Sequence, residues 1–370
     1  MKQRPPFRAE HVGSLLRPKR LMEKRDLYFR GGCTAEELRA VEDECIREVV
    51  RKQEDVGLHS ITDGEFRRTF FHVDFLERLD GVSTTEGSFT AAFRRDDGTQ
   101  VGFKPPTMRV TGKIRHAEPI QGRDFDFLRS ATTRTPKVSI PSPSMLHFRG
   151  GREGIDATAY PDLDGFYADL AAAYREEIAD LAARGCRYIQ LDDTNLAYLC
   201  DDKIREATRA RGDDPNELPR VYARLINDAI RDRAPDMAVG VHLCRGNYKS
   251  AWVAQGGYEP VAEILFNEMN VDAFFLEYDD ARSGGFAPLR FVPKGKTVVL
   301  GIMTTKHPEL ESADELRRRI DEAASYLPLD QLALSPQCGF SSTAHGNDLT
   351  EDDQWRKLAR IVEVAAAVWR

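Results

Sequence analysis

The sequence predicts an α/β protein of the (β/α)8-barrel (TIM) type, with residues 1–370 forming a single domain. Three observations predict this class. Short apolar runs alternate with amphipathic helical segments along the chain, as in parallel βα units. The runs number about eight, which is the number of strands that closes such a barrel. No run is followed by a GxGxxG or GxxxxGK[ST] loop, so a doubly wound nucleotide-binding sheet is not supported.

The expected strands are short and apolar, and they cover residues 7–15, 59–65, 137–140, 188–191, 238–243, 273–276, 297–302 and 332–334. The expected helices have a 3.6-residue apolar period and cover residues 34–56, 164–184, 217–232, 258–269, 312–326 and 350–370. Thr34 and Ser312 each precede a glutamate by three residues, which is capping-box spacing. The range 81–134 is less regular and is interpreted as an insertion that carries a β-hairpin.

Composition narrows the class of function. The chain is 41% hydrophobic, and its formal net charge is −7, which argues against nucleic acid or an anionic membrane as a partner. No signal peptide and no apolar stretch of membrane-spanning length can be recognised. The six cysteines show neither disulfide-framework nor CxxC spacing. We therefore expect a cytoplasmic protein whose cysteines are thiols.

Four side chains with metal-binding chemistry follow the ends of expected strands. His242 and Cys244 lie in VGVHLCRGN, Glu277 ends AFFLEYDD, and Cys338 follows LALSPQC. In a (β/α)8 barrel these strand ends meet on one face. Alternate residues of a strand point to the same side, so His242 and Cys244 form a natural chelating pair. Zinc accepts such a mixture of nitrogen, sulfur and oxygen ligands in tetrahedral geometry.

Each of these residues also has an ordinary interpretation on its own. A cysteine at a strand end is commonly a packed, inert thiol. A glutamate at a strand end commonly forms a salt bridge or a helix cap. The joint occurrence of all four on one predicted face is what favours zinc.

A second polar set is expected at the same face. His11-Val-Gly-Ser14 ends the first expected strand, Asp63-Gly-Glu65 ends the second, and Asp192-Asp193 ends a later one. Grouped carboxylates bind cationic amines or transfer protons. Helix capping, above all by Asp193, and ion pairs with nearby arginines are the alternative roles.

Seven motifs, in this order, resemble those of the cobalamin-independent methionine synthase family, specifically its C-terminal catalytic barrel and the short bacterial proteins made of that barrel alone. They are HVGSLLRP, ITDGEFRR, YIQLDDTN, VHLCRGN, FFLEYDD, VLGIMTTK and SPQCGFSS. The resemblance implies that zinc is held by His242, Cys244, Glu277 and Cys338. It implies that homocysteine is bound beside the metal by Gly13, Ser14, Glu65 and Asp192.

The resemblance also implies methyl transfer onto a metal-activated thiol, which yields methionine from homocysteine. The family's proton-donating histidine aligns with Lys306, and His307 stands next to it, so either residue is a candidate for the acid. Asp193 stands where the longer enzymes have glutamate. The match covers the catalytic barrel without the barrel that precedes it in longer members. The expected donor is accordingly a methyltetrahydrofolate, a methyl-corrinoid protein or another methylated compound.

Three other functions stay open at this point. The first is alkyl transfer to a different thiol, such as a coenzyme M-like sulfonate, which Glu65 and Asp192 suit poorly. The second is a metal-free barrel related to uroporphyrinogen decarboxylase, which leaves the cysteine pair unexplained. The third is a non-catalytic protein with a structural zinc ion, because four protein ligands are also typical of structural sites.

Overall fold

The computed structural model describes residues 4–85, 87, 91–104 and 106–370. Positions 86, 88–90 and 105 of the expected insertion lie outside the described residues. The described chain is an α/β structure built on one six-stranded parallel sheet with the order β12-β11-β10-β9-β8-β7. Its strands are β7 (Val138–Pro141), β8 (Tyr188–Asp193), β9 (Ala238–Leu243), β10 (Ala273–Glu277), β11 (Thr297–Met303) and β12 (Leu332–Pro336).

The strands of this sheet are buried on both faces, which is why they are continuous apolar runs. In β10, Phe274 and Leu276 pack in the large core beneath the helices. Phe275, which points the other way, packs with Tyr188 and Val299 in a small cluster on the opposite face. The two faces thus carry separate apolar cores.

Short parallel pieces adjoin both edges of the sheet. Strand β1 (Ser60–Ile61) pairs with β6 (Thr135–Pro136), directly before β7. At the other edge, Ala9 forms a parallel bridge with Leu334 of β12.

The buried carboxylate of Glu10 connects these pieces to the sheet. It accepts hydrogen bonds from the Ser60 hydroxyl at 2.8 Å and the Tyr188 hydroxyl at 3.0 Å, and it lies 3.5 Å from the Lys137 ammonium.

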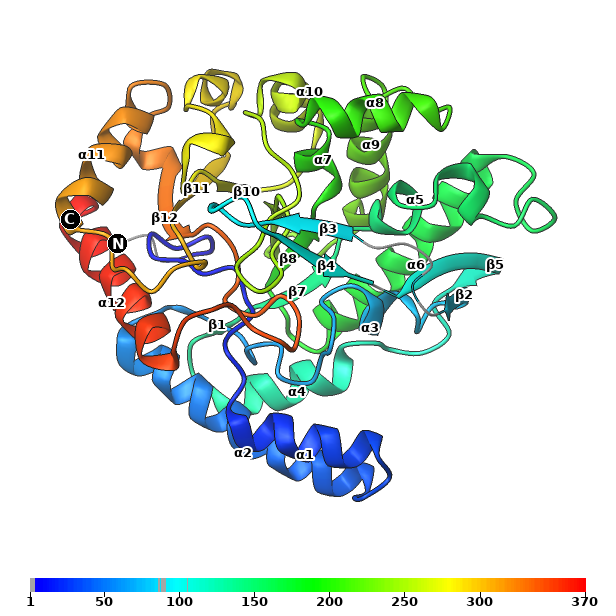
Figure 1. The fold of residues 1–370 in the computed structure, drawn as a ribbon, viewed down its shortest axis with the longest axis horizontal. Helices are drawn as coiled ribbons and strands as arrows, with labels where there is room; N and C mark the ends of the chain where they lie inside the picture. The colour runs from blue at the N-terminus through cyan, green and yellow to red at the C-terminus, as the bar shows by residue number, and fades with distance from the viewer. Residues whose placement is uncertain (1–3, 86, 88–90, 105) are drawn as a thin grey trace.

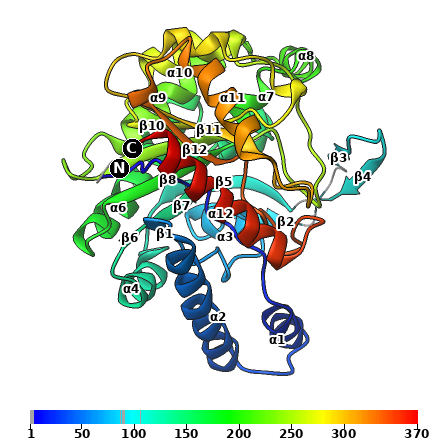
Figure 2. The ribbon, with the colours of Figure 1, turned by 90° about the vertical axis from the view of Figure 1, so that its left-hand side faces the viewer.

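Helices surround the sheet in Figure 1. They are α1 (Lys19–Phe29), α2 (Ala35–Val56), α3 (Val73–Leu76), α4 (Gly122–Ala131), α5 (Met145–Phe148), α6 (Leu163–Ala183), α7 (Asn195–Tyr198), α8 (Asp202–Ala210), α9 (Leu218–Ile230), α10 (Glu259–Glu268), α11 (Ala313–Ala324) and α12 (Glu351–Val368). Single 3-10 turns lie at Gly151–Gly154, Ala281–Ser283, Ala287–Phe291 and Leu329–Gln331. Figure 2 shows α1 and α2 projecting away from the sheet.

The expected helix starts are confirmed by cap geometry. The Thr34 hydroxyl accepts a hydrogen bond from the Glu37 amide, and the Glu37 carboxylate accepts one from the Thr34 amide, which completes a capping box. The same helix ends at Gly57, whose φ of 101° lies in the left-handed region that favours glycine. Ser312 likewise accepts from the Glu315 amide at the start of α11.

The region interpreted as an insertion holds two antiparallel pairs. Strand β2 (Asp80–Thr85) pairs with β5 (Thr107–Arg115), and β3 (Ala91–Arg94) pairs with β4 (Gln100–Phe103) as a hairpin. Both views place the β3–β4 hairpin to one side of the sheet, in front of it in Figure 1. The same range also contains α4, a regular helix that the sequence interpretation did not anticipate.

Two expected strands are much shorter than predicted. The range 7–15 contains only the bridge at Ala9, and the range 59–65 contains only β1. The extended chain ends early in both because of backbone conformation. Gly13 has a φ of 146°, and Gly64 and Glu65 have φ values of 68° and 58°. These positive values turn the chain out of the strand direction.

In the part of the chain that the structure describes, no helix has the length and apolar character needed to cross a bilayer. All six cysteines are free thiols.

Candidate metal centre and active site

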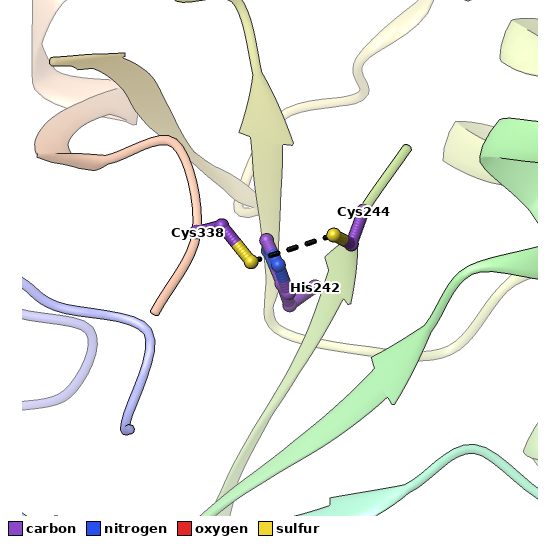
Figure 3. A group of neighbouring side chains, drawn as sticks. All are labelled: His242, Cys244 and Cys338. Atoms are coloured by element: carbon purple, nitrogen blue, oxygen red, sulfur yellow. Dashed lines mark hydrogen bonds between the residues drawn. The ribbon is translucent and has the colours of Figure 1, made fainter. Parts of the chain in front are cut away.

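Three potential ligands converge at the carboxyl ends of β9 and β12. His242 is the fifth residue of β9, Cys244 follows that strand directly, and Cys338 lies two residues after β12. The parallel register pairs His242 with Phe275 of β10, so β9 and β10 end side by side. Figure 3 shows the three side chains pointing toward one another.

The ligand atoms of His242, Cys244 and Cys338 all lie within 4.8 Å of one another, and all three residues are buried. The two Sγ atoms are 3.4 Å apart and share a hydrogen bond in which either thiol can be the donor. Two thiolates on a tetrahedral zinc ion at a Zn–S distance of about 2.3 Å lie about 3.8 Å apart. The observed spacing therefore needs little adjustment to accept zinc.

The three members of this group shift one another's pKa values. The hydrogen bond with Cys244 and the charge of His242 hold the pKa of Cys338 well below its ordinary value. The same hydrogen bond, together with burial, raises the pKa of Cys244. Burial lowers the pKa of His242, but the charges of Cys338 and Asp192 outweigh it and leave the pKa raised. Both ring nitrogens of His242 are buried with no hydrogen-bond partner among the described residues. A metal ion would satisfy that imidazole and both sulfurs.

Glu277, expected as the fourth ligand, lies next to this group but outside it. Its Oε1 atom is 2.6 Å from Arg282 and 3.4 Å from Lys306, and its Oε2 atom accepts the Arg245 amide at 2.9 Å. Burial raises the pKa of Glu277, but the charges of Lys306 and Arg282 bring it down to about 2. Its negative charge also acts on all three members of the group.

A cavity of about 340 Å³ opens onto the three ligands. Its polar wall contains Ser14, Glu65 and Asp192, so the structure brings three of the four expected acceptor-binding residues to the metal group. Gly13, the fourth, is not among the described lining residues but lies directly behind them. A Cβ atom at Gly13 would stand 2.7 Å from the Ser139 hydroxyl and 3.1 Å from Oε1 of Glu65, so a larger residue there would displace Glu65.

The carboxyl groups of Glu65 and Asp192 have pKa values that are raised toward neutral pH. Burial raises the pKa of Glu65 to about 7, with Arg68 opposing this effect. Burial also raises the pKa of Asp192 to about 6, with the charge of His242 opposing it. The Oε2 atom of Glu65 has no hydrogen-bond partner among the described residues. An ammonium group would stabilise both carboxylates in their charged forms.

Asp193 also lines the cavity, but its carboxylate is engaged by the protein. It accepts the Leu196 amide at 2.8 Å and the Ser144 hydroxyl. By accepting an amide at the start of α7, Asp193 plays the helix-capping role that the sequence analysis gave as its alternative.

The two candidates for the acid are not among the described cavity-lining residues. Lys306 is buried between Glu277 and Asp279, at 3.4 and 3.5 Å. His307 is exposed, and its Nε2 atom is 2.7 Å from the carboxylate of Asp96 on the β3–β4 hairpin.

The family follows from these positions together with one comparison. The sequence model of the cobalamin-independent synthase catalytic domain matches residues 7–366. The chain belongs to this family. All seven quoted motifs, and the cavity that they surround, lie inside the matched range.

Individual members of the cobalamin-independent synthase family differ in length. The uncharacterized protein YxjH of Bacillus subtilis is 47% identical over 373 residues, covering 100% of this chain and 96% of that protein. The 5-methyltetrahydropteroyltriglutamate–homocysteine methyltransferase of Thermotoga petrophila is 24% identical over 344 residues, covering 91% of this chain but 42% of that protein. The solved structure of a Listeria monocytogenes protein, named as a candidate vitamin-B12 independent methionine synthase, superposes with a TM-score of 0.80 at 39% identity, with full coverage of both chains.

Much of the remaining cavity wall was missed by sequence reasoning. Phe93 and Phe103 of the hairpin stand against Tyr248, with the Phe103 and Tyr248 rings stacked at 4.3 Å. The cavity wall also includes His72 and Arg149. Phe93 and Phe103, one on each strand of the hairpin, were a usable signal for an apolar face. No sequence signal marks His72 or Arg149.

Proposed function

We propose that this protein is a zinc-dependent S-methyltransferase that moves a methyl group onto the thiol of homocysteine and forms methionine. One observation carries the proposal. The buried His242–Cys244–Cys338 group opens into the same cavity as Glu65 and Asp192. One cavity thus contains a site for a soft metal and two carboxylates that can bind an amine. An amino acid with a thiol side chain needs both.

The metal would be held by His242, Cys244 and Cys338, with Glu277 as the fourth ligand. When bound, zinc supplies positive charge that removes the proton from an arriving thiol at neutral pH. The protein's own groups set up this chemistry. Two sulfurs and an imidazole converge in a buried pocket, and Arg282 and Lys306 hold the Glu277 carboxylate beside them.

On the acceptor side, Glu65 and Asp192 bind the ammonium group, and the Gly13-Ser14 turn binds the carboxylate. Orientation is the main task of these residues. The thiolate sulfur forms a bond to the methyl carbon while the bond from that carbon to the donor breaks. The two buried carboxylates favour an amino-acid acceptor over a sulfonate-bearing thiol, because a sulfonate beside them is repelled.

The donor is a methyltetrahydrofolate, a methyl-corrinoid protein or another methylated compound. If the leaving atom is a nitrogen, it gains a proton. We propose His307 for this role over Lys306, because Lys306 is buried and ion-paired with Glu277 and Asp279. His307 is exposed beside the hairpin. The two candidates are compared by measuring the rate of single-turnover methyl transfer in the variants His307→Ala and Lys306→Ala. If the rate is unchanged in both variants, neither residue is the acid.

We further propose that residues 1–370 form one (β/α)8-barrel domain with the region 81–134 inserted. Two observations support closure of the sheet. The bridge between Ala9 and Leu334 extends it beyond β12, and the pairing of β1 with β6 extends it beyond β7. Between these two edges, the Ser60 hydroxyl of β1 donates a hydrogen bond to the carboxylate of Glu10, the residue after Ala9.

The activity is tested by incubating zinc-loaded protein with homocysteine and each donor class, followed by mass spectrometry for methionine. We expect methionine with at least one donor and release of a proton when homocysteine binds. If the protein takes up zinc but neither binds homocysteine nor releases a proton, the metal is structural and the proposal is overturned.

A further inference from the structure

One arginine of the cavity wall has no partner among the described residues. Arg149, the residue after α5, lines the cavity, and its guanidinium makes no hydrogen bond or ion pair with any residue that the structure describes. Two other arginines are tied to the protein. Arg17 donates to the Ser341 hydroxyl and to backbone carbonyls, and Arg245 donates to the Glu277 and Gly256 carbonyls. Because Arg149 is exposed to the open cavity, its charge and its five N–H donors are available to a ligand that enters there.

The nearest groups add donors without adding negative charge. His72, which precedes α3, is 3% exposed and lines the cavity with both ring nitrogens lacking a partner among the described residues. Burial, followed by the positive charge of Arg149, holds the pKa of His72 well below its ordinary value. His72 is therefore a neutral imidazole able to donate one hydrogen bond. Asp213, an acid of this region, is already paired with Arg211 at 2.7 Å.

We propose that Arg149 and His72 form a subsite for an oxyanion, a carboxylate or phosphate group, carried by the second substrate. A guanidinium fork matches both groups in shape and charge. The imidazole N–H of His72 supplies a further hydrogen bond. The identity of the occupant as the methyl donor rests on the proposed function, whereas anion binding by the two side chains does not.

The charge of the subsite assigns it to the donor. The cavity wall carries both signs of charge, with the carboxylates of Glu65 and Asp192 and the guanidinium of Arg149. An acceptor whose ammonium group is held by the two carboxylates leaves Arg149 unused. Tyr198 also lines the cavity, and its hydroxyl is close enough to Arg149 and to Cys244 for both charges to act on it. A molecule bound at Arg149 therefore shares one cavity with the sulfurs.

The walls of the subsite are aromatic. Phe71 packs on the His72 ring with centroids 4.6 Å apart, and Phe148 meets Tyr198 edge-on at 6.2 Å. All four residues line the cavity. Figure 1 shows α3, α5 and α7, which border these residues, on the right-hand half of the molecule. A planar ring that bears the anion fits this environment better than a free inorganic ion does.

Three probes of matched size test the subsite: benzoate, phenyl phosphate and neutral benzamide. Each is titrated into the zinc-loaded protein without homocysteine, and binding is followed by ligand-observed NMR. The variants are Arg149→Gln, Arg149→Lys, His72→Gln and the control Arg209→Gln, which changes an exposed arginine of α8. Zinc content and far-UV circular dichroism establish that each variant is folded.

We expect benzoate or phenyl phosphate, but not benzamide, to bind, and the tighter of the two identifies the anion. Arg149→Gln should weaken binding by about tenfold to a hundredfold. Arg149→Lys should recover part of that loss, and the control should match the wild type. Equal binding of benzamide, or anion binding that is unchanged in Arg149→Gln, would overturn the assignment.

A donor test separates this inference from the proposed function. Arg149→Gln should raise the KM for an anionic methyl donor by at least about tenfold while kcat changes less. Methionine formation with an unchanged donor KM contradicts the subsite alone. Anion binding that depends on Arg149, with no methionine from any donor, contradicts the proposed function alone.

Discussion

Three ligand atoms and two carboxylates define the chemistry at the scale of residues. His242, Cys244 and Cys338 come from positions nearly a hundred residues apart, yet their ligand atoms lie within 4.8 Å. Glu65 and Asp192 face the same cavity with raised pKa values. One cavity thus holds a group of soft metal ligands and, apart from them, two carboxylates that can bind an ammonium group.

The first prediction concerns the two sulfurs. Cys244→Ser and Cys338→Ser should each lower zinc affinity by at least about a hundredfold, because a neutral hydroxyl replaces a thiolate ligand. Competition with a chromogenic chelator measures this. Cys200→Ser is the matched control, since that buried thiol donates only to the Leu196 carbonyl. Full zinc affinity in both site variants would refute the ligand assignment.

The second prediction concerns pH. Glu65 has a pKa of about 7, raised from 4.5 by burial, so it is protonated below that pH and charged above it. An ammonium ligand needs the charged form. Methionine, which has no thiol to titrate, should therefore bind up to about tenfold more tightly at pH 8 than at pH 6. Calorimetry measures this, and Glu65→Gln should flatten the dependence. Tighter binding at pH 6 would contradict the role of Glu65.

Sequence reasoning at this scale succeeded where residues follow a strand pattern. The alternation of His242 and Cys244 along β9 placed both on one side, and the structure brings Cys338 to them. Arg149 and His72 could not be found in this way. They are single residues outside any strand pattern, and their distinction is the absence of a partner, which only the folded arrangement reveals.

At the scale of elements, the β3–β4 hairpin contributes part of the cavity wall and is attached to two loops. It pairs through Arg94 with Trp252 in the segment after β9. The Asp96 carboxylate accepts a hydrogen bond from the Trp252 indole and contacts His307. The hairpin thus joins the segments that follow β9 and β11. Its two phenylalanines complete the aromatic wall of the cavity.

The third prediction tests this attachment. Asp96→Ala removes contacts with Trp252 and His307 and should increase tryptic cleavage at Arg94 and Arg95 several-fold, because the hairpin then opens more often. Asp97→Ala is the matched control, since its carboxylate accepts from Thr99 within the hairpin turn. Equal cleavage rates in the two variants would show that Asp96 does not hold the hairpin.

Elements were predictable where their signals are local. The capping box at Thr34 marked the start of α2, and the bounds predicted for β9 match the structure. The attachment of the hairpin was not predictable, because Arg94 and Trp252 are far apart in the sequence. The early ends of the first two expected strands depend on positive φ values at Gly13, Gly64 and Glu65. A glycine permits such a turn but does not require it.

At the scale of the whole molecule, a buried polar centre joins the N-terminal segment to the sheet. The Lys137 ammonium lies 3.5 Å from Glu10 and donates to the His11 carbonyl. Glu10 also accepts from Ser60 and Tyr188. Four parts of the chain therefore meet at one carboxylate.

The fourth prediction follows from that centre. Lys137→Met leaves the Glu10 charge buried without a counter-ion and should lower the free energy of unfolding by about 3–5 kcal/mol. Urea denaturation measures the loss. The double variant Glu10→Gln with Lys137→Met should recover part of it, because the uncompensated charge is gone. A single variant as stable as the wild type would contradict the role of this ion pair.

The α/β class with a parallel sheet could be predicted from pattern alone, because parallel strands buried on both faces are continuous apolar runs. The buried centre around Glu10 could not be predicted, since a glutamate before a strand end normally indicates solvent exposure. Its partners lie 50, 127 and 178 residues away.

The central claim is that the His242–Cys244–Cys338 group binds zinc and receives the substrate thiol. X-ray absorption at the zinc edge tests it most directly, with spectra of the zinc-loaded protein before and after homocysteine is added. We expect two sulfur ligands at first and a third at about 2.3 Å once homocysteine is bound. A sulfur count that stays at two with saturating homocysteine would contradict the claim.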